Sequence, residues 1–94
     1  MLRCLELVNN FAYGETNGKA SNLYIEGNVL VNYDTPIAFR THEGIVLNSS
    51  KYSMTTSKNQ NLIRRTGKVV AELEEADFNK ALSNANPNWY YTYC

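Results

Sequence analysis

The sequence predicts a small α+β domain with an N-terminal helix, an antiparallel β-meander of four to five strands and two short helices packed on the sheet. Apolar residues recur at helical spacing near both ends, glycine- and asparagine-containing turns separate short strand-like segments, and hydroxyl residues open a further helical stretch. A chain of 94 residues buries only about 60 to 65% of its unfolded surface, so we expect a single domain over residues 1–94.

The first helix is expected over residues 3–12. Gly14 follows at the place where a helix would stop. Residues 14–21 are small and polar with two glycines, which indicates a loop. The apolar residues that predict the buried face of this helix are Leu5, Val8, Phe11 and Ala12.

The central block, residues 22–48, is expected to form the meander. Gly27 and Asn28 suit the positive φ angles of a tight hairpin turn. Residues 34–36 are expected to form the next turn, and residues 41–44 the tip of a second hairpin. The four predicted strands are residues 22–26, 29–33, 37–40 and 45–47.

The last third of the chain predicts a basic helix over residues 57–66, a strand over 68–73 and a helix over 75–85. Ser57 and Gln60 have the spacing of a capping box, which places the start of the basic helix. Alternating apolar residues indicate the strand. The last helix combines an apolar face at i, i+3, i+4 and i+7 with acidic residues in its first turn, where the helix dipole favours them.

A net charge of zero hides a segregation of charge along the chain. Residues 1–50 carry three basic and five acidic side chains, and residues 69–94 carry one basic and four acidic side chains. Residues 51–68, which we call the basic segment, carry five basic side chains and no acidic one. They are Lys51, Lys58, Arg64, Arg65 and Lys68.

The basic helix is expected to have two different sides. A helical wheel places Asn59, Leu62, Ile63 and Thr66 on the inner side. The outer side holds Lys58, Asn61, Arg64 and Arg65. Together with Lys51 and Lys68, these residues form a predicted surface for an anionic partner. In the alternative interpretation, the basic residues only form ion pairs with Glu72, Glu74 and Glu75 of the same chain.

The C-terminal segment, residues 88–94, is rich in aromatic residues. Trp89 and Tyr91 would lie on the same side of a strand, and tryptophan and tyrosine are frequent anchors of protein interfaces. We add both residues to the predicted partner-binding surface. A strand packed on the meander and a disordered end are the other interpretations.

The sequence contains no motif typical of catalysis or metal binding. His42, the only histidine, falls in a predicted hairpin tip, and the two cysteines lack the spacing of zinc ligands. Gly14 and Gly18 match neither the Walker nor the dinucleotide-binding pattern. We expect a protein that is not an enzyme and needs no cofactor or metal. Without a long apolar segment or a signal peptide, we expect a cytoplasmic protein without membrane contact.

Four segments of the chain resemble those of a known group of proteins. They are Gly18-Lys19-Ala20-Ser21-Asn22-Leu23, Ile25-Glu26-Gly27, Thr35-Pro36-Ile37-Ala38 and Tyr52-Ser53-x-Thr55-Thr56-Ser57-Lys58-x-Gln60. The chain is similar, over about residues 5–66, to a family of small phage- and plasmid-borne proteins known mainly as uncharacterised domains. Asn59 stands where that family usually has histidine. The resemblance implies an origin on a mobile element and supplies no active-site residues.

The resemblance also implies a function. Small phage proteins without catalytic residues often act by occupying the surface of a host protein, and anti-CRISPR proteins are the largest such group. The expected function is therefore stoichiometric inhibition of a host defence system, with a CRISPR effector or its nucleic-acid complex as the partner. A simple DNA mimic would be strongly acidic, and this chain is not.

Two other functions stay open. The first is a nucleic-acid-binding accessory protein that contacts phosphates through helix 57–66. The second is a structural protein that associates with itself through Trp89. The sequence does not define the oligomeric state.

Overall fold

The computed structural model of the chain describes residues 3–85. It confirms the α+β class, with three helices and a six-stranded sheet in the described part of the chain. The elements are α1 (Cys4–Ala12), β1 (Asn17–Ala20), β2 (Leu23–Glu26), β3 (Val29–Asn32), β4 (Thr35–Thr41), β5 (Gly44–Asn48), α2 (Met54–Arg65), β6 (Val69–Leu73) and α3 (Glu75–Ala85). The aromatic segment 88–94, with Trp89 and Tyr91, lies outside the described residues, so its interpretations stay predictions.

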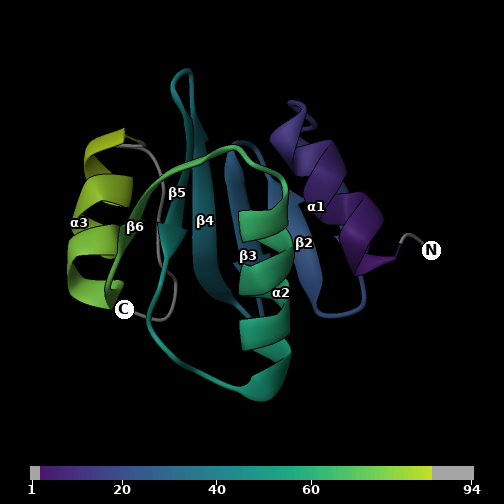
Figure 1. Cartoon of the computed structure of the whole chain (residues 1–94). Helices are drawn as coiled ribbons and strands as arrows, with labels where there is room; N and C mark the ends of the chain where they lie inside the picture. The colour runs from purple at the N-terminus through teal and green to yellow at the C-terminus, as the bar shows by residue number, and fades with distance from the viewer. Residues whose placement is uncertain (1–2, 86–94) are drawn as a thin grey trace.

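The six strands lie in the order of the sequence. Strands β1 to β5 form a continuous antiparallel meander, whereas β6 pairs with β5 in parallel. Helix α2 makes the connection between these two parallel strands. Helices α1 and α2 cover one face of the sheet and α3 covers the other, which gives three layers (Figure 1). None of the helices within residues 3–85 is long and apolar enough to cross a membrane.

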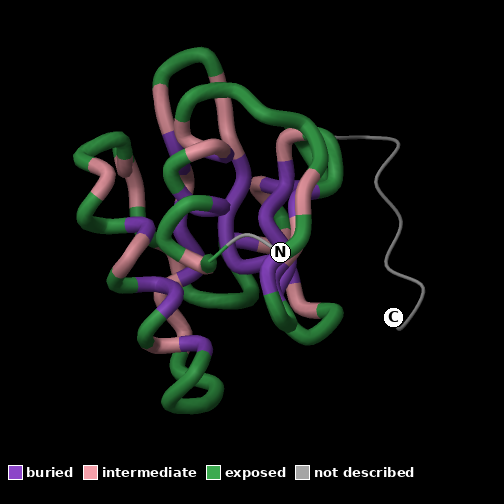
Figure 2. The backbone as a smooth tube through the Cα atoms, turned by 90° about the vertical axis from the view of Figure 1, so that its right-hand side faces the viewer, coloured by how far each residue is buried: buried purple, intermediate pink, exposed green. Residues whose placement is uncertain are grey.

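Each face of the sheet has its own core. On one side, Leu7, Phe11 and Ile63 from the helices pack against strand residues. On the other side, Phe78 and Leu82 of α3 pack against β3 and β4, and the rings of Phe78 and Phe39 lie 5.4 Å apart. Figure 2 shows the buried residues concentrated along the strands and on the inner sides of the helices.

The buried face of α1 differs from the prediction at one position. Val8 and Phe11 are buried as expected, but Leu5 is 50% exposed and Leu7 is fully buried instead. The guanidinium of Arg40 in β4 fixes the orientation of the helix, since it donates 2.6 Å and 3.1 Å hydrogen bonds to the carbonyl oxygens of Phe11 and Glu15.

The predicted loop 14–21 contains a strand, β1, which the sequence prediction missed. Its residues pair with β2, and Gly18 allows Leu7 of α1 to approach closely, because a Cβ at Gly18 would lie 2.8 Å from Leu7 Cδ1. The second turn is also shifted. Tyr33 and Asp34 have positive φ angles and form the turn, whereas Pro36 lies inside β4, beside a register shift in the β3–β4 pairing.

Helix α2 begins three residues earlier than predicted. Ser53 caps it, because its hydroxyl accepts a 3.2 Å hydrogen bond from the Thr56 amide. The predicted capping box of Ser57 and Gln60 is wrong, since the Gln60 side chain bonds to the carbonyl oxygens of residues 48 and 50 instead. The two predicted sides of the helix are confirmed: Asn59 and Ile63 are buried, and Lys58, like the other outer-side residues, is exposed.

A buried polar network lies between α2 and β3. Asn32 of β3 donates a 2.7 Å hydrogen bond to the Thr56 hydroxyl and accepts a 3.0 Å hydrogen bond from Asn59. All three residues are at least 96% buried. Because a buried polar atom without a partner is costly, these bonds select one position of α2 over the sheet.

We expect Asn59→Ala to lower the free energy of unfolding by about 1 to 3 kcal/mol, because it leaves the Asn32 side-chain oxygen buried without a donor. Asn61→Ala, on the exposed side of the same helix, serves as the control for helix propensity. Urea denaturation of the full chain measures both. Equal stability of the two variants would contradict a structural role for the network.

Candidate partner-binding groove

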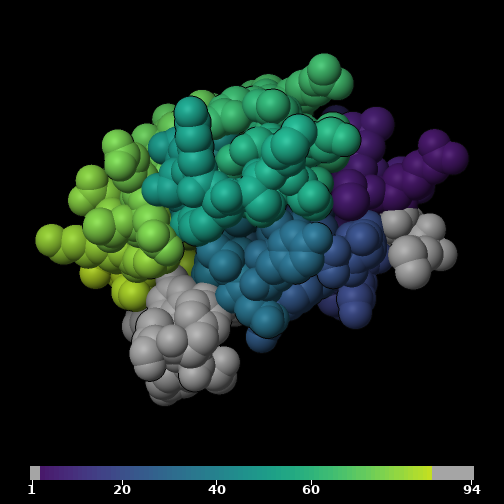
Figure 3. Space-filling view, turned by 90° about the horizontal axis from the view of Figure 1, so that it is seen from below, coloured from purple at the N-terminus to yellow at the C-terminus, as the bar shows by residue number. Residues whose placement is uncertain are grey.

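An open groove of about 430 Å³ lies at the N-terminal end of α2. Its lining residues are Lys51, Tyr52, Ser53, Met54, Ser57, Lys58 and Asn61. Figure 3 views the molecule from this end. Three of the predicted partner-binding residues, Lys51, Lys58 and Asn61, therefore meet in one place.

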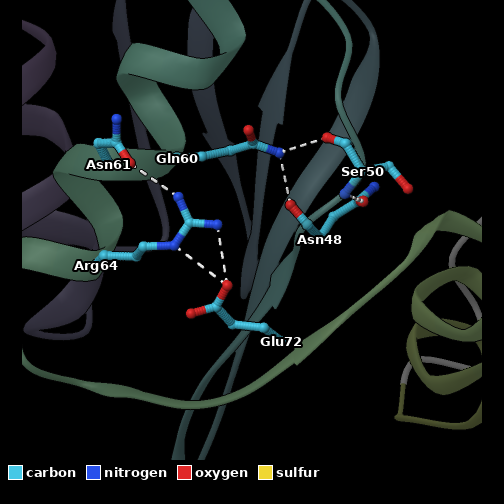
Figure 4. A network of polar contacts seen from close by, with 6 residues as sticks. All are labelled: Asn48, Ser50, Gln60, Asn61, Arg64 and Glu72. Atoms are coloured by element: carbon cyan, nitrogen blue, oxygen red, sulfur yellow. Dashed lines mark hydrogen bonds and ion pairs between the residues drawn. The ribbon is translucent and has the colours of Figure 1, made fainter.

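The loop before α2 is held in place by two amide side chains. Gln60 donates hydrogen bonds of 2.6 Å and 2.9 Å to the carbonyl oxygens of Asn48 and Ser50 (Figure 4). The Asn48 side chain in turn donates a 2.9 Å hydrogen bond to the Tyr52 hydroxyl. These bonds fix the course of residues 48–53 and therefore the position of the groove wall that they form.

The remaining basic residues do not join this groove. Arg64 forms a 2.9 Å ion pair with Glu72 of β6. This pair was expected in the alternative interpretation, in which the basic residues pair with Glu72, Glu74 and Glu75. No second ion pair forms between residues 3 and 85, so the predicted pairing does not extend to Glu74 and Glu75 there. Lys68 lies at the other end of α2, a helix of about 18 Å, with its amino group 5.6 Å from the centre of the Tyr13 ring.

Lys51 and Lys58 are exposed, and neither forms an ion pair with any residue of the described part of the chain. Arg65 is exposed as well and lies seven positions after Lys58, two turns further along the same side of α2. The positive charge of the basic segment is thus distributed along the helix. Only two of its five basic side chains, Lys51 and Lys58, line the groove.

One acidic residue of α3, Glu75, is linked to the loop before α2 and to Tyr52 of the groove. The Glu75 amide donates a 2.7 Å hydrogen bond to the Ser50 hydroxyl, which ties the start of α3 to the loop before α2. Burial raises the pKa of the Tyr52 phenol; the Asn48 hydrogen bond opposes this rise, and the Glu75 carboxylate adds to it. The negative charge of Glu75 in α3 therefore acts on Tyr52, a residue of the groove.

The Tyr-Ser-x-Thr-Thr-Ser-Lys segment and Gln60 divide into two sets. Ser53, Thr56 and Gln60 make internal hydrogen bonds that position α2. Tyr52, Ser57 and Lys58 form the second set, which lines the groove, and Ser53 lines it as well. Asn59 belongs to the internal set, and a histidine at that position could donate a similar N–H bond.

Four groove residues were not among the predicted partner-binding residues: Tyr52, Ser53, Met54 and Ser57. Met54 carried a usable signal, since an apolar residue among exposed polar ones is worth noting, and its side chain is 84% exposed. The described residues include no group of three or more histidine, cysteine, aspartate or glutamate side chains that could hold a metal ion. His42 lies in the exposed β4–β5 turn, as predicted.

Comparison with known proteins identifies a family but no characterised relative. No curated protein and no solved structure matches the chain significantly. Residues 6–80 match the sequence profile of DUF8033, which is described as a family of unknown function. The match runs from α1 into α3 and includes every residue of the groove. The chain belongs to the DUF8033 family.

Proposed function

We propose that this chain is a phage- or mobile-element-encoded inhibitor that binds a host defence protein, with a CRISPR effector as the expected partner, and acts stoichiometrically without catalysis. The supporting observation is the groove, which is lined by two exposed lysines without an acidic partner among residues 3–85 and whose preceding loop is bonded to the acidic start of α3. The mobile-element origin and the class of partner come from the resemblance carried by the four segments of residues 18–60.

The arrangement of charge favours a protein partner over a nucleic acid. A nucleic acid presents negative charge along its whole length, so it would be attracted by Lys51 and Lys58 but repelled by Glu75, which is bonded to the loop before α2. A protein surface carries both signs and can complement both regions. The chain is neutral overall, and neutrality removes the long-range attraction that most nucleic-acid-binding domains use.

The exposed apolar area of the groove also favours a protein partner over a nucleic acid. The side chains of Met54 and Tyr52 are 84% and 40% exposed at the groove. Methionine and tyrosine are enriched in protein interfaces, where they add apolar area to polar contacts. Such interfaces combine central apolar anchors with a surrounding polar rim. The groove supplies both kinds of contact within a few residues of sequence.

The nucleic-acid-binding function is the second candidate. It is favoured by the spacing of Lys58 and Arg65, which lie two helical turns apart on the exposed side of α2. An accessory protein of this kind would contact phosphates through these residues and Lys51.

We expect this chain to restore transformation by a targeted plasmid in a bacterium with matched CRISPR immunity, and the effector to co-purify with it at a constant molar ratio. Lys58→Glu should reduce both effects, because it reverses a charge in the groove. Lys19→Glu makes the same change in net charge on the exposed surface of β1 and should leave both effects unchanged. Absence of protection together with absence of effector binding would contradict the proposal.

Retention on immobilised DNA and RNA separates the second candidate from the first. If the chain binds protein, we expect no salt-sensitive retention on either polymer. A nucleic-acid-binding protein would instead be retained, and Lys58→Glu with Arg65→Glu would lower its salt slope by about two. The second outcome, measured by elution in a salt gradient, would favour the accessory protein.

A further inference from the structure

We propose that the groove binds an acidic segment of the partner protein, in which a carboxylate lies between Lys51, Lys58 and the Asn61 amide while a neighbouring apolar side chain contacts Met54. Arg64 acts as a positioning residue for Asn61. This inference rests on the proposed function and specifies the chemistry of the segment that the partner presents.

The polar groups that line the groove are mainly hydrogen-bond donors. Lysine carries three N–H donors and no acceptor, and both Lys51 and Lys58 line the groove without a described acidic partner. The Ser57 hydroxyl can donate as well. A lining of this kind is matched by a ligand that only accepts hydrogen bonds and carries negative charge.

Asn61 is turned into a donor by Arg64. The Arg64 guanidinium donates a 2.8 Å hydrogen bond to the Asn61 side-chain oxygen. A guanidinium has no acceptor, so the oxygen of Asn61 must face it and the amide nitrogen must face away (Figure 4). The nitrogen is thereby available to a ligand in the groove that Asn61 lines.

Glu72 holds Arg64 in this orientation. One carboxylate oxygen of Glu72 accepts hydrogen bonds from two guanidinium nitrogens of Arg64, at 3.2 Å and 2.9 Å. The ion pair connects β6 to α2, and Arg64 in turn bonds to Asn61 (Figure 4). Asn61 lines the groove. Arg64 therefore does not line the groove itself but orients Asn61, which does.

A carboxylate fits this environment better than a phosphate. The Glu75 amide bonds to the Ser50 hydroxyl, which places Glu75 next to the loop that forms the groove wall. Burial is the main cause of the raised pKa of Tyr52, and the Glu75 carboxylate adds to it. A phosphate monoester carries about two negative charges at neutral pH, and a carboxylate carries one. The second charge of the phosphate would gain attraction from Lys51 and Lys58 as well as repulsion from Glu75, so the kind of side chain in the lining decides between the two ligands. Phosphopeptide sites are typically built from clustered arginines, and the seven groove residues include none. The exposed Met54 then favours a peptide with an apolar residue beside its acid.

The test uses the full chain, labelled with ¹⁵N, and a nine-residue peptide in which glutamates flank a leucine. We expect this peptide to shift the amide signals of Lys51, Met54 and Lys58 and the side-chain NH₂ signal of Asn61. A matched peptide with glutamine in place of glutamate should bind about tenfold more weakly, which corresponds to a loss of about 1.4 kcal/mol. Shifts located elsewhere, or equal binding of the two peptides, would overturn the proposal.

Two groups of variants sharpen the result. Lys51→Glu and Lys58→Glu should each weaken peptide binding about five- to tenfold, whereas Lys19→Glu, with the same net charge, should bind like the native chain. Arg64→Met removes no group that lines the groove. It should nevertheless abolish the response of the Asn61 side-chain signal while the other backbone signals of the fold stay in place. An unchanged Asn61 response in Arg64→Met would overturn the positioning role.

Two further probes define the ligand class. A phosphoserine peptide of the same length and a twelve-residue oligothymidylate should bind more weakly than the glutamate peptide, and tighter binding of either would overturn the carboxylate assignment. If the glutamate peptide fails to bind but the chain still protects a targeted plasmid, only this inference fails. If the peptide binds and protection is absent, the groove chemistry stands and the proposed function fails.

Discussion

The hydrogen bonds between β3 and α2 are the constraint on which the rest of this structure depends. Asn32 can satisfy its buried amide only if Thr56 and Asn59 lie directly above it, and this requirement fixes where α2 lies on the sheet. Gln60 then fixes the preceding loop from the same helix. The positions of Lys51 and Lys58 at the groove follow from these buried contacts, although both lysines are exposed.

Local patterns in the sequence predict much of this fold. The helix over residues 75–85 and the two sides of α2 follow from helical periodicity, and the structure has both. These local patterns fail to predict an element when contacts between residues distant in sequence determine its structure. Strand β1 forms because it pairs with β2 and packs under Leu7, and neither contact leaves a periodic signal in a glycine-containing segment.

Some residues of the candidate groove could likewise be predicted from local patterns, and others could not. Lys51, Lys58 and Asn61 could be predicted from charge and a helical wheel. The start of α2 could not, because three hydroxyl residues after Ser53 are also possible caps, and the bonds of Gln60 to the loop before α2 are visible only in the fold. The use of Ser53 as the cap moves Met54 and Ser57 to the groove. It also shows that much of the Tyr-Ser-x-Thr-Thr-Ser-Lys segment has a structural role.

Some residues of α2 and its preceding loop stabilise the fold, and neighbouring residues are available for binding. Side chains that face the sheet are buried and satisfied, whereas Lys51 and Lys58 have no described acidic partner within the chain. Unpaired surface lysines contribute little to folding, and they are available to a partner with opposite charge. Arg64 links the two functions, since it joins β6 to α2 and orients Asn61.

Hydrogen–deuterium exchange of the full chain, free and in complex with its captured partner, tests the central claim most directly. The account predicts that protection on binding is concentrated in residues 51–61, the segment that forms the groove. Protection confined to β1 and β2, with unchanged exchange in residues 51–61, would contradict it.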